Sequence, residues 1–269
     1  MSREIHNPAE SAMENLPTAT SIDAEVTGDG SPLVLLHSLL ADRSSFAHVA
    51  GPLSKQFRVM LPALPGFGRS PAVEDGLAAV ADRIAASIQA FSGGRPVRLL
   101  GNGYGGFIAL QIVIRHPGLV DRLVLADAGA AFSEPGREAF RGMARAAAAK
   151  GLEAIADTAM RRLFAPDFHA ANPDLVAERR RIFLESNPAV IIAACEALAA
   201  LDLRPDLAKV RIPVLAVVGA QDEATPPAMS HEVVAGLPNA TLTILEGLAH
   251  VPQLQAPQRF LDAVVPFLS

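Results

Sequence analysis

The feature of the sequence that most constrains its fold is a regular alternation of short apolar runs with segments of helical periodicity. Between the apolar runs, apolar side chains recur every three or four residues, as on one face of the predicted helix 76–91. Unbroken apolar runs are typical of strands buried on both faces of a sheet. Such runs lie at residues 32–37 and 57–64, and further strands are predicted at 97–101, 122–127, 213–220 and 240–247. Strands alternating with helices predict an α/β fold, a mostly parallel sheet flanked by helices.

The alternation is interrupted in the middle of the chain. Between residues 133 and 203 several helical segments follow one another without a strand. We interpret 133–203 as a helical cap inserted over one end of the sheet, and 19–132 together with 204–269 as the core domain. Residues 1–18 are polar and are predicted to form a flexible N-terminus.

Composition excludes several classes of function. The formal charge of -5 and the scattered arginines give no basic field, so we expect no nucleic-acid partner. Cys195 is the single cysteine, which excludes a disulfide framework and a cysteine metal cluster. No stretch approaches the roughly 20 apolar residues of a membrane span, and no signal peptide precedes the fold. We expect a soluble, cytoplasmic protein with no membrane partner and no bound metal, and the sequence leaves its oligomeric state open.

The glycine-rich stretch LLGNGYGGFIAL, residues 99–110, has two interpretations. Gly101, Gly103 and Gly106 match the G-x-G-x-x-G turn that binds the pyrophosphate of a dinucleotide, and Asp127 ends the next strand where a ribose-binding acid belongs. The same stretch matches a G-x-S-x-G nucleophile elbow, a sharp turn between a strand and a helix, in which Gly103 replaces the serine. The two interpretations predict different proteins.

The loops that follow the other predicted strands favour the elbow. Asp222 comes just after one buried strand and His250 just after the next. Because the carboxyl ends of parallel strands meet at one edge of a sheet, we expect both residues to converge on Gly103. The order elbow, acid, histidine is that of α/β-hydrolases. Asp127 ends a strand at the same edge and is a second candidate for the acid that orients the histidine.

Backbone amides around this edge are candidates for an oxyanion hole. The amide of Tyr104 directly follows the elbow position, and that of Leu39 lies in the turn after strand 32–37. Ser38 and Ser70 lie in nearby loops. Neither occupies a turn between a strand and a helix, so we interpret both as structural.

From about residue 22 onward the sequence resembles the α/β-hydrolase superfamily, and within it the 3-oxoadipate enol-lactonase-like hydrolases. The segments that carry the resemblance are LLHSLLADRSSF, LPALPGFGRS, LLGNGYGGFIAL, the cap segment LFAPDFHAANPDLVAERRRIF, GAQDEATPP and GLAHVPQLQAP. Three positions depart from the family pattern. Ala63 replaces a common aspartate, Gln255 replaces a common glutamate, and Gly103 stands at the position of the serine nucleophile.

The resemblance implies a catalytic arrangement and a substrate class. Asp222 would orient His250, His250 would act as general base and then general acid, and the Leu39 and Tyr104 amides would hold the oxyanion. The cap would shape a pocket for a small carboxylic ester, lactone or amide, and no cofactor is implied. Several arginines of the cap could pair with a substrate carboxylate, and the sequence singles out none of them: Arg137, Arg141, Arg161 and Arg162.

Glycine at the elbow leaves three hypotheses open. The turn requires a positive φ, which glycine adopts freely, so a change from serine to glycine would keep the fold and remove the attacking oxygen. Loss of such a nucleophile slows catalysis by about a millionfold. The chain is then a hydrolase disarmed at Gly103, a natural enzyme in which Asp222 and His250 activate water or act as the base of a lyase or isomerase, or a ligand-binding protein without turnover.

Overall fold

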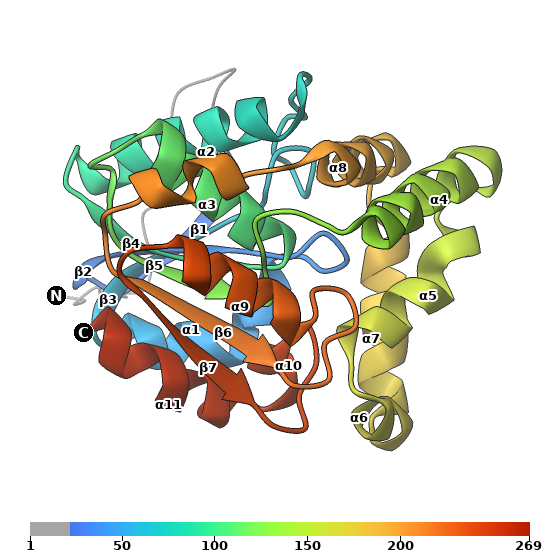
Figure 1. Ribbon diagram of the computed structural model, residues 1–269. Coiled ribbons are helices and arrows are strands. Elements are labelled where there is room, and N and C mark those ends of the chain that lie inside the picture. The colour runs from blue at the N-terminus through green and yellow to red at the C-terminus, as the bar shows by residue number, and fades with distance from the viewer. Residues whose placement is uncertain (1–21) are drawn as a thin grey trace, which may run out of the picture.

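The computed structural model describes residues 22–269, and the predicted flexible segment 1–18 lies outside them. Its centre is a seven-stranded sheet in the order β1-β3-β2-β4-β5-β6-β7 (Figure 1). The strands are β1 (Ala24–Thr27), β2 (Ser31–Leu36), β3 (Phe57–Pro62), β4 (Val97–Asn102), β5 (Val120–Ala126), β6 (Val214–Gly219) and β7 (Ala240–Leu245). All neighbours from β3 to β7 pair in parallel. The predicted α/β fold with a mostly parallel sheet is confirmed.

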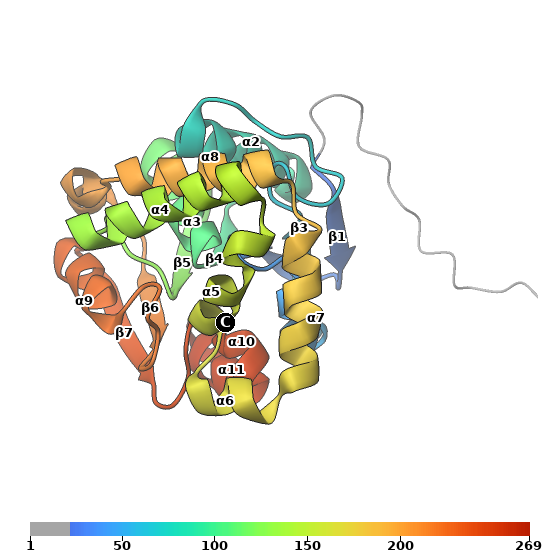
Figure 2. The same ribbon diagram turned by 90° about the vertical axis from the view of Figure 1, so that its right-hand side faces the viewer.

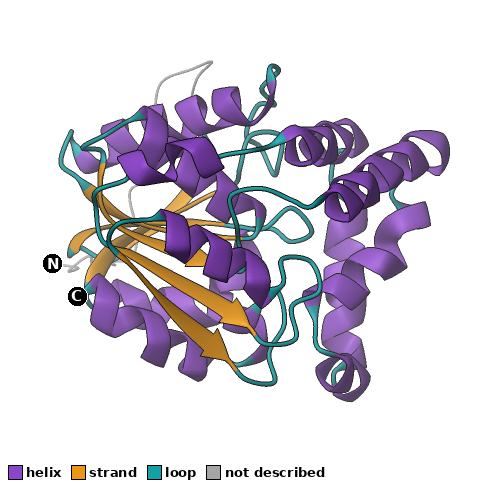
Figure 3. Ribbon diagram, viewed as in Figure 1, coloured by secondary structure: helices purple, strands orange, loops and turns teal. Residues whose placement is uncertain are grey.

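Helices cover both faces of the sheet (Figure 3). The helices of the core domain are α1 (Ala47–Ser54), α2 (Gly76–Ser92), α3 (Tyr104–Arg115), α9 (Pro227–Gly236), α10 (Pro252–Gln255) and α11 (Pro257–Leu268), with 3-10 helices η1 (Arg43–Phe46) and η2 (Arg204–Lys209). Successive residues of β2 alternate between the two resulting cores, as the pleat requires: Val34 and Leu36 pack with α2 and α3, and Leu33 and Leu35 with α1 and α11. Both faces of β2 are therefore buried, as its unbroken apolar run indicated, whereas the edge strands β1 and β7 are partly exposed.

Two local features were not evident from the sequence. The Gly28-Asp29-Gly30 turn does not pair the strands that it connects, because β1 pairs antiparallel with β3 instead of with β2. Helix α1 was also missed. It is eight residues long, contains Pro52 and has little polar contrast between its faces, so its sequence carries no strong helical period.

Five helices between β5 and β6 form the cap, which lies over one end of the sheet (Figures 1 and 2). They are α4 (Glu134–Lys150), α5 (Glu153–Leu163), α6 (Pro166–Ala171), α7 (Pro173–Leu184) and α8 (Pro188–Ala200). Helix α4 packs along α8, and α5 along α7. Arg137 on α4 donates to the carbonyls of Phe132, Ala199 and Leu201 and so ties both ends of the insertion together. The predicted helical cap is confirmed, and its limits of 133 and 203 stay a prediction.

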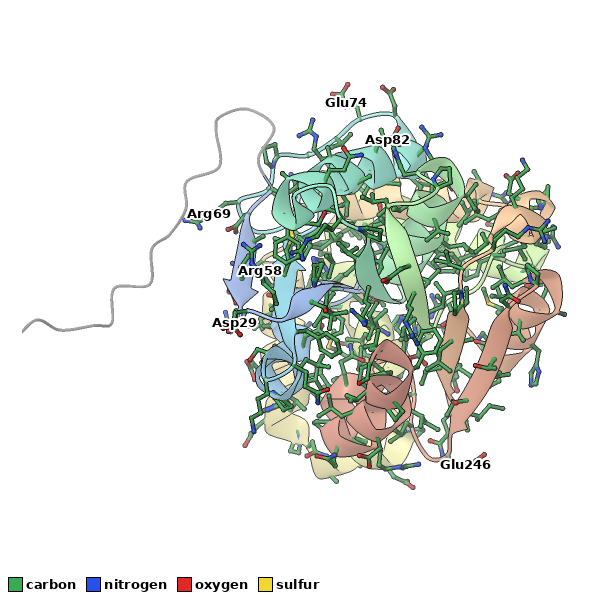
Figure 4. All side chains as sticks on the ribbon, turned by 90° about the vertical axis from the view of Figure 1, so that its left-hand side faces the viewer. Asp29, Arg58, Arg69, Glu74, Asp82 and Glu246 are labelled. Carbon is green, nitrogen blue, oxygen red and sulfur yellow. The ribbon has the colours of Figure 1, made fainter. Side chains whose placement is uncertain are left out.

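Figure 4 shows charged side chains of both signs around the outline of the molecule, among them Asp29, Arg69, Glu74 and Glu246. Within residues 22–269, no single helix has the length and apolar composition of a membrane span. Helices α7 and α8 have that length and composition only when taken together, and the two helices are bent by 95° relative to each other.

Candidate active site

The glycine-rich stretch forms a sharp turn from β4 into α3, with Gly103 at its apex. Gly103 has φ 52° and ψ -118°, a conformation that L side chains rarely adopt. The strand and the helix approach so closely that a Cβ on Gly101 would overlap the carbonyl of Gly105. The amide of Gly103 donates to the carbonyl of Ala126, which ties the turn to the end of β5. The turn has the geometry of a nucleophile elbow without the serine side chain.

Asp222 and His250 meet at the same edge of the sheet. His250 Nδ1 lies 2.9 Å from Asp222 Oδ2, and both side chains are at least 95% buried. Asp222 Oδ1 accepts from the amides of Ala224 and Thr225, at 2.8 and 3.1 Å. Burial acts to raise the pKa of Asp222, but the charge and hydrogen bond of His250 and the bonds from Thr225 hold the pKa below its ordinary value. Asp222 is therefore an ionised partner for the histidine.

Asp127, the second candidate acid, has a different environment. Its Oδ1 accepts from the amide of Gly219 at 2.8 Å, and its Oδ2 lies 3.4 Å from Asn102 Nδ2. No hydrogen bond joins it to His250 among the described residues. Burial and the charge of Asp222 raise the pKa of Asp127 well above its ordinary value. Asp127 therefore braces the β6 loop, and the geometry favours Asp222 for the role of orienting the histidine.

The structure places a serine hydroxyl against the histidine from an unexpected loop. Ser38 Oγ lies 3.1 Å from His250 Nε2, and Ser38 is 1% exposed. The hydrogen bonds therefore run from Ser38 through His250 to Asp222. The expectation of a site without a serine hydroxyl is not borne out. The sequence analysis interpreted Ser38 as structural because it follows β2 and does not occupy the elbow after β4. Strands β2 and β4 are parallel neighbours, so the loops that follow them lie side by side.

Gly103 explains how Ser38 reaches the histidine. A Cβ added to Gly103 would overlap the Ser38 hydroxyl and would lie 2.6 Å from His250 Nε2. The Ser38 hydroxyl thus borders the volume that a side chain at the elbow would need. The two positions compete for the same space beside the imidazole.

The backbone amides of Leu39 and Tyr104 have no acceptor in the described part of the chain. Tyr104 is the first residue of α3, and its N-cap Gly103 supplies no side-chain cap. The following amides are used, since Gly105 donates to His37 and Gly106 to Gly103. Both free amides belong to residues that line the cavity described below. Their role as an oxyanion hole stays a prediction.

Three polar side chains that the sequence did not single out hold these loops in place. Asn102 Nδ2 donates to the carbonyl of His250 at 2.9 Å. The Thr225 hydroxyl lies 2.6 Å from Asp222 Oδ2 and 2.7 Å from the carbonyl of Asp127.

The third side chain, His37, binds two backbone groups. Its Nε2 accepts from the amide of Leu64 at 3.0 Å, and burial lowers the pKa of the ring, which is therefore neutral. Its Nδ1 carries the hydrogen and donates to the Ser38 carbonyl, 2.9 Å away. Polar residues ending buried strands, such as Asn102 and His37, are the signal that could have identified these positions.

A cavity of about 30 Å³ lies between this edge of the sheet and the cap. The core contributes six residues around the hydrogen-bonded side chains: Ser38, Leu39, Gly103, Tyr104, Thr225 and His250. The cap contributes Phe140, Arg162 and Leu198. Within residues 22–269, no group of three or more His, Cys, Asp or Glu side chains is placed to hold a metal ion.

Comparisons with known proteins agree with this geometry. The family described as alpha/beta hydrolase fold matches residues 31–257. A pimeloyl-[acyl-carrier protein] methyl ester esterase from Aeromonas hydrophila is 29% identical over 92% of this chain and 99% of its own length. A 3-oxoadipate enol-lactonase 2 from Acinetobacter baylyi is 31% identical over 61% of this chain and 60% of its own length. The crystal structure of the enol-lactonase from Burkholderia xenovorans LB400 superposes with a TM-score of 0.85 at 26% identity, covering 92% of this chain and 96% of that one.

The chain belongs to the α/β-hydrolase family. It is a hydrolase whose relatives include esterases and lactonases. The family match favours the elbow over the dinucleotide-binding turn for residues 99–110.

Proposed function

We propose that this protein hydrolyses small carboxylic esters and lactones, and that Ser38 supplies the nucleophile in place of the missing elbow serine. The observation that carries the proposal is the buried chain of hydrogen bonds, 3.1 Å from Ser38 Oγ to His250 Nε2 and 2.9 Å from His250 Nδ1 to Asp222 Oδ2. A hydroxyl, an imidazole and an ionised carboxylate in this order are the parts that acyl transfer requires. Likeness to curated lactonases and methyl ester esterases supports the substrate class.

In this mechanism, Ser38 Oγ attacks the ester carbonyl while His250 Nε2 takes its proton. Asp222 holds the imidazole in the tautomer with hydrogen on Nδ1 and stabilises the imidazolium that forms. The free amides of Leu39 and Tyr104 donate to the carbonyl oxygen as it becomes negative. The imidazolium then protonates the departing alkoxide, which leaves an ester on Ser38. Water, deprotonated by His250, hydrolyses that ester and restores the serine.

The cavity supports a second mechanism for the same reaction. A water molecule in it would border both His250 and the empty side-chain position of Gly103. His250, oriented by Asp222, would deprotonate this water, and the water would attack the carbonyl without a covalent intermediate. Ser38 would then position the water through its hydroxyl.

Replacing Ser38 by alanine separates the two mechanisms. If Ser38 is the nucleophile, we expect Ser38→Ala to lower kcat for a panel of 4-nitrophenyl esters and small lactones by at least about 10⁴-fold. The matched control is Ser45→Ala, because the buried Ser45 hydroxyl has no hydrogen-bond partner among the described residues. Substantial activity in Ser38→Ala would contradict the nucleophile and favour the activated water.

Covalent labelling gives an independent readout. A fluorophosphonate probe should modify Ser38 in the natural chain, as peptide mass spectrometry would show, and should leave Ser38→Ala unlabelled. Failure of the natural chain to hydrolyse any ester or lactone, together with the absence of labelling, would contradict the proposed function. Activity that appears only in Gly103→Ser would instead support a hydrolase disarmed at the elbow.

A further inference from the structure

The wall of the cavity contains one permanently charged side chain, Arg162 of the cap. The other lining residues are apolar, aromatic or small, apart from Ser38, Thr225 and His250 of the hydrogen-bonded site. No aspartate or glutamate lines the cavity. The cavity next to the proposed nucleophile is therefore lined by the cation Arg162 and by no anionic side chain.

The contacts of Arg162 leave most of its hydrogen-bonding capacity unused. Within the described residues its one hydrogen bond runs from Nη1 to the sulfur of Met143, at 3.2 Å, and it forms no ion pair. A thioether is a weak acceptor, whereas a guanidinium offers five N–H donors. Burial raises the pKa of the neighbouring Cys195 thiol to about 12, so this group stays neutral and provides no counter-charge. Arg162 is half-buried, which makes an unpaired charge costly.

Other arginines of the cap are satisfied by the protein itself. Arg141 pairs with Glu134 and Glu138, and Arg180 with Glu153 and Asp157. Arg137 donates to three backbone carbonyls. Arg161, the sequence neighbour of Arg162, is exposed and donates to Thr158. Arg162 differs from these residues because it faces the cavity and has most of its N–H donors unused.

We propose that Arg162 determines substrate specificity by binding a carboxylate carried by the ester or lactone. The proposal rests on the proposed function, because it assumes that the carbonyl to be attacked lies at Ser38 and His250. Arg162 lines the same cavity as Ser38 and His250, so a substrate whose carbonyl lies at the nucleophile can place its other end against the guanidinium. A guanidinium binds a carboxylate through two parallel charge-assisted hydrogen bonds, which fixes the orientation as well as the charge of the ligand. The preferred substrates are then small esters or lactones with one additional carboxylate.

Two pairs of esters that differ only in charge test this proposal. In one pair the carboxylate is on the acyl chain (4-nitrophenyl hydrogen succinate against 4-nitrophenyl 4-methylpentanoate). In the other it is on the alcohol (carboxymethyl butyrate against isobutyl butyrate). We expect the natural chain to prefer the anion in at least one pair, and Arg162→Gln to reduce this preference in kcat/KM by about 10- to 100-fold. Arg162→Lys should keep part of the preference, and the control Arg161→Gln should keep all of it.

The outcomes separate this proposal from the proposed function. If both members of each pair are hydrolysed equally well by the natural chain and by Arg162→Gln, the role of Arg162 is contradicted while the hydrolase stands. If no ester is hydrolysed, the proposed function fails, and binding of butyrate against butyramide, followed by ligand-observed NMR, tests Arg162 alone. Butyrate binding at least about tenfold weaker in Arg162→Gln than in Arg161→Gln would support the carboxylate site. Equal binding by the two variants would overturn it.

Discussion

The two sides of the cavity are held in place by different kinds of interaction. On the core side, buried side chains bond to backbone groups of neighbouring loops, as Asn102 does to the His250 carbonyl and as Asp222 does to two amides. On the cap side, many of the polar contacts are exposed ion pairs, such as Arg141 with Glu134. Exposed ion pairs contribute about 0 to 1 kcal/mol each, because water screens them and long side chains must be ordered.

This difference separates the chemistry from the selection of substrate. The core side fixes the reacting groups within a network in which each buried polar atom depends on its neighbours. The cap side presents apolar side chains and one unpaired cation, Arg162, on helices that pack mainly with each other. We therefore expect substitutions in the core wall to change the rate of reaction, and substitutions in the cap to change stability or specificity.

The largest effect that would sharpen this comparison is expected at the two aspartates of the core wall. Asp222→Asn should lower kcat by about 10⁴-fold, because an amide cannot hold the imidazole in the required tautomer or stabilise its positive charge. Asp127→Asn should keep activity close to that of the natural chain, because this side chain bonds Gly219 and Asn102 and not His250. Steady-state ester hydrolysis by both variants, with circular dichroism to verify folding, measures the difference. Equal losses would show that both aspartates serve His250.

The next comparison uses one glycine from each side. In Gly103→Ala the new Cβ would overlap Ser38 Oγ and press on His250 Nε2 at a positive φ, so we expect a loss of about 1–3 kcal/mol of stability and an activity lower by about 100-fold. In Gly142→Ala, within α4, the nearest atom to the Cβ is Arg145 Nη2 at 3.9 Å. This change should stabilise the protein by about 0.5–1 kcal/mol and leave activity unchanged. Urea denaturation and ester hydrolysis test both variants, and a fully active Gly103→Ala would contradict the crowding around Ser38.

The smallest effect concerns the contact between the cap and the loop that follows Leu39. Arg179 on α7 is 6% exposed and donates to Ser44 Oγ at 2.8 Å, whereas the adjacent Arg180 is a third exposed and pairs with carboxylates at the surface. Arg179→Gln should lower the free energy of unfolding by about 1–2 kcal/mol. Arg180→Gln should change it by less than about 0.5 kcal/mol. Similar changes in the two denaturation midpoints would mean that the cap is not anchored through Arg179.

The architecture could be predicted from the sequence because strands and helices leave a periodic pattern of apolar residues within each segment. Apolar segments at 97–101 and 213–220 predicted strands of a parallel sheet, and both are strands in the structure. The sequence also placed Asp222 and His250 at strand ends, and topology alone brings such ends together. Helix α1 was missed because its sequence shows no helical periodicity. The pairing of β1 with β3 was missed because the turn between β1 and β2 does not determine which strand β1 pairs with.

What the sequence by itself determined about this protein is therefore its α/β-hydrolase fold, its helical cap and the positions of an acid and a histidine at one edge of the sheet. Only the tertiary structure decided which side chain occupies the space beside that histidine. A hydroxyl on the β2 loop reaches the imidazole because Gly103, in the turn after β4, has no side chain beside them. The choice of Asp222 over Asp127 as the acid beside His250, the raised pKa of Asp127 and the unused donors of Arg162 have the same origin. Each depends on burial and on contacts between segments that are distant in the chain.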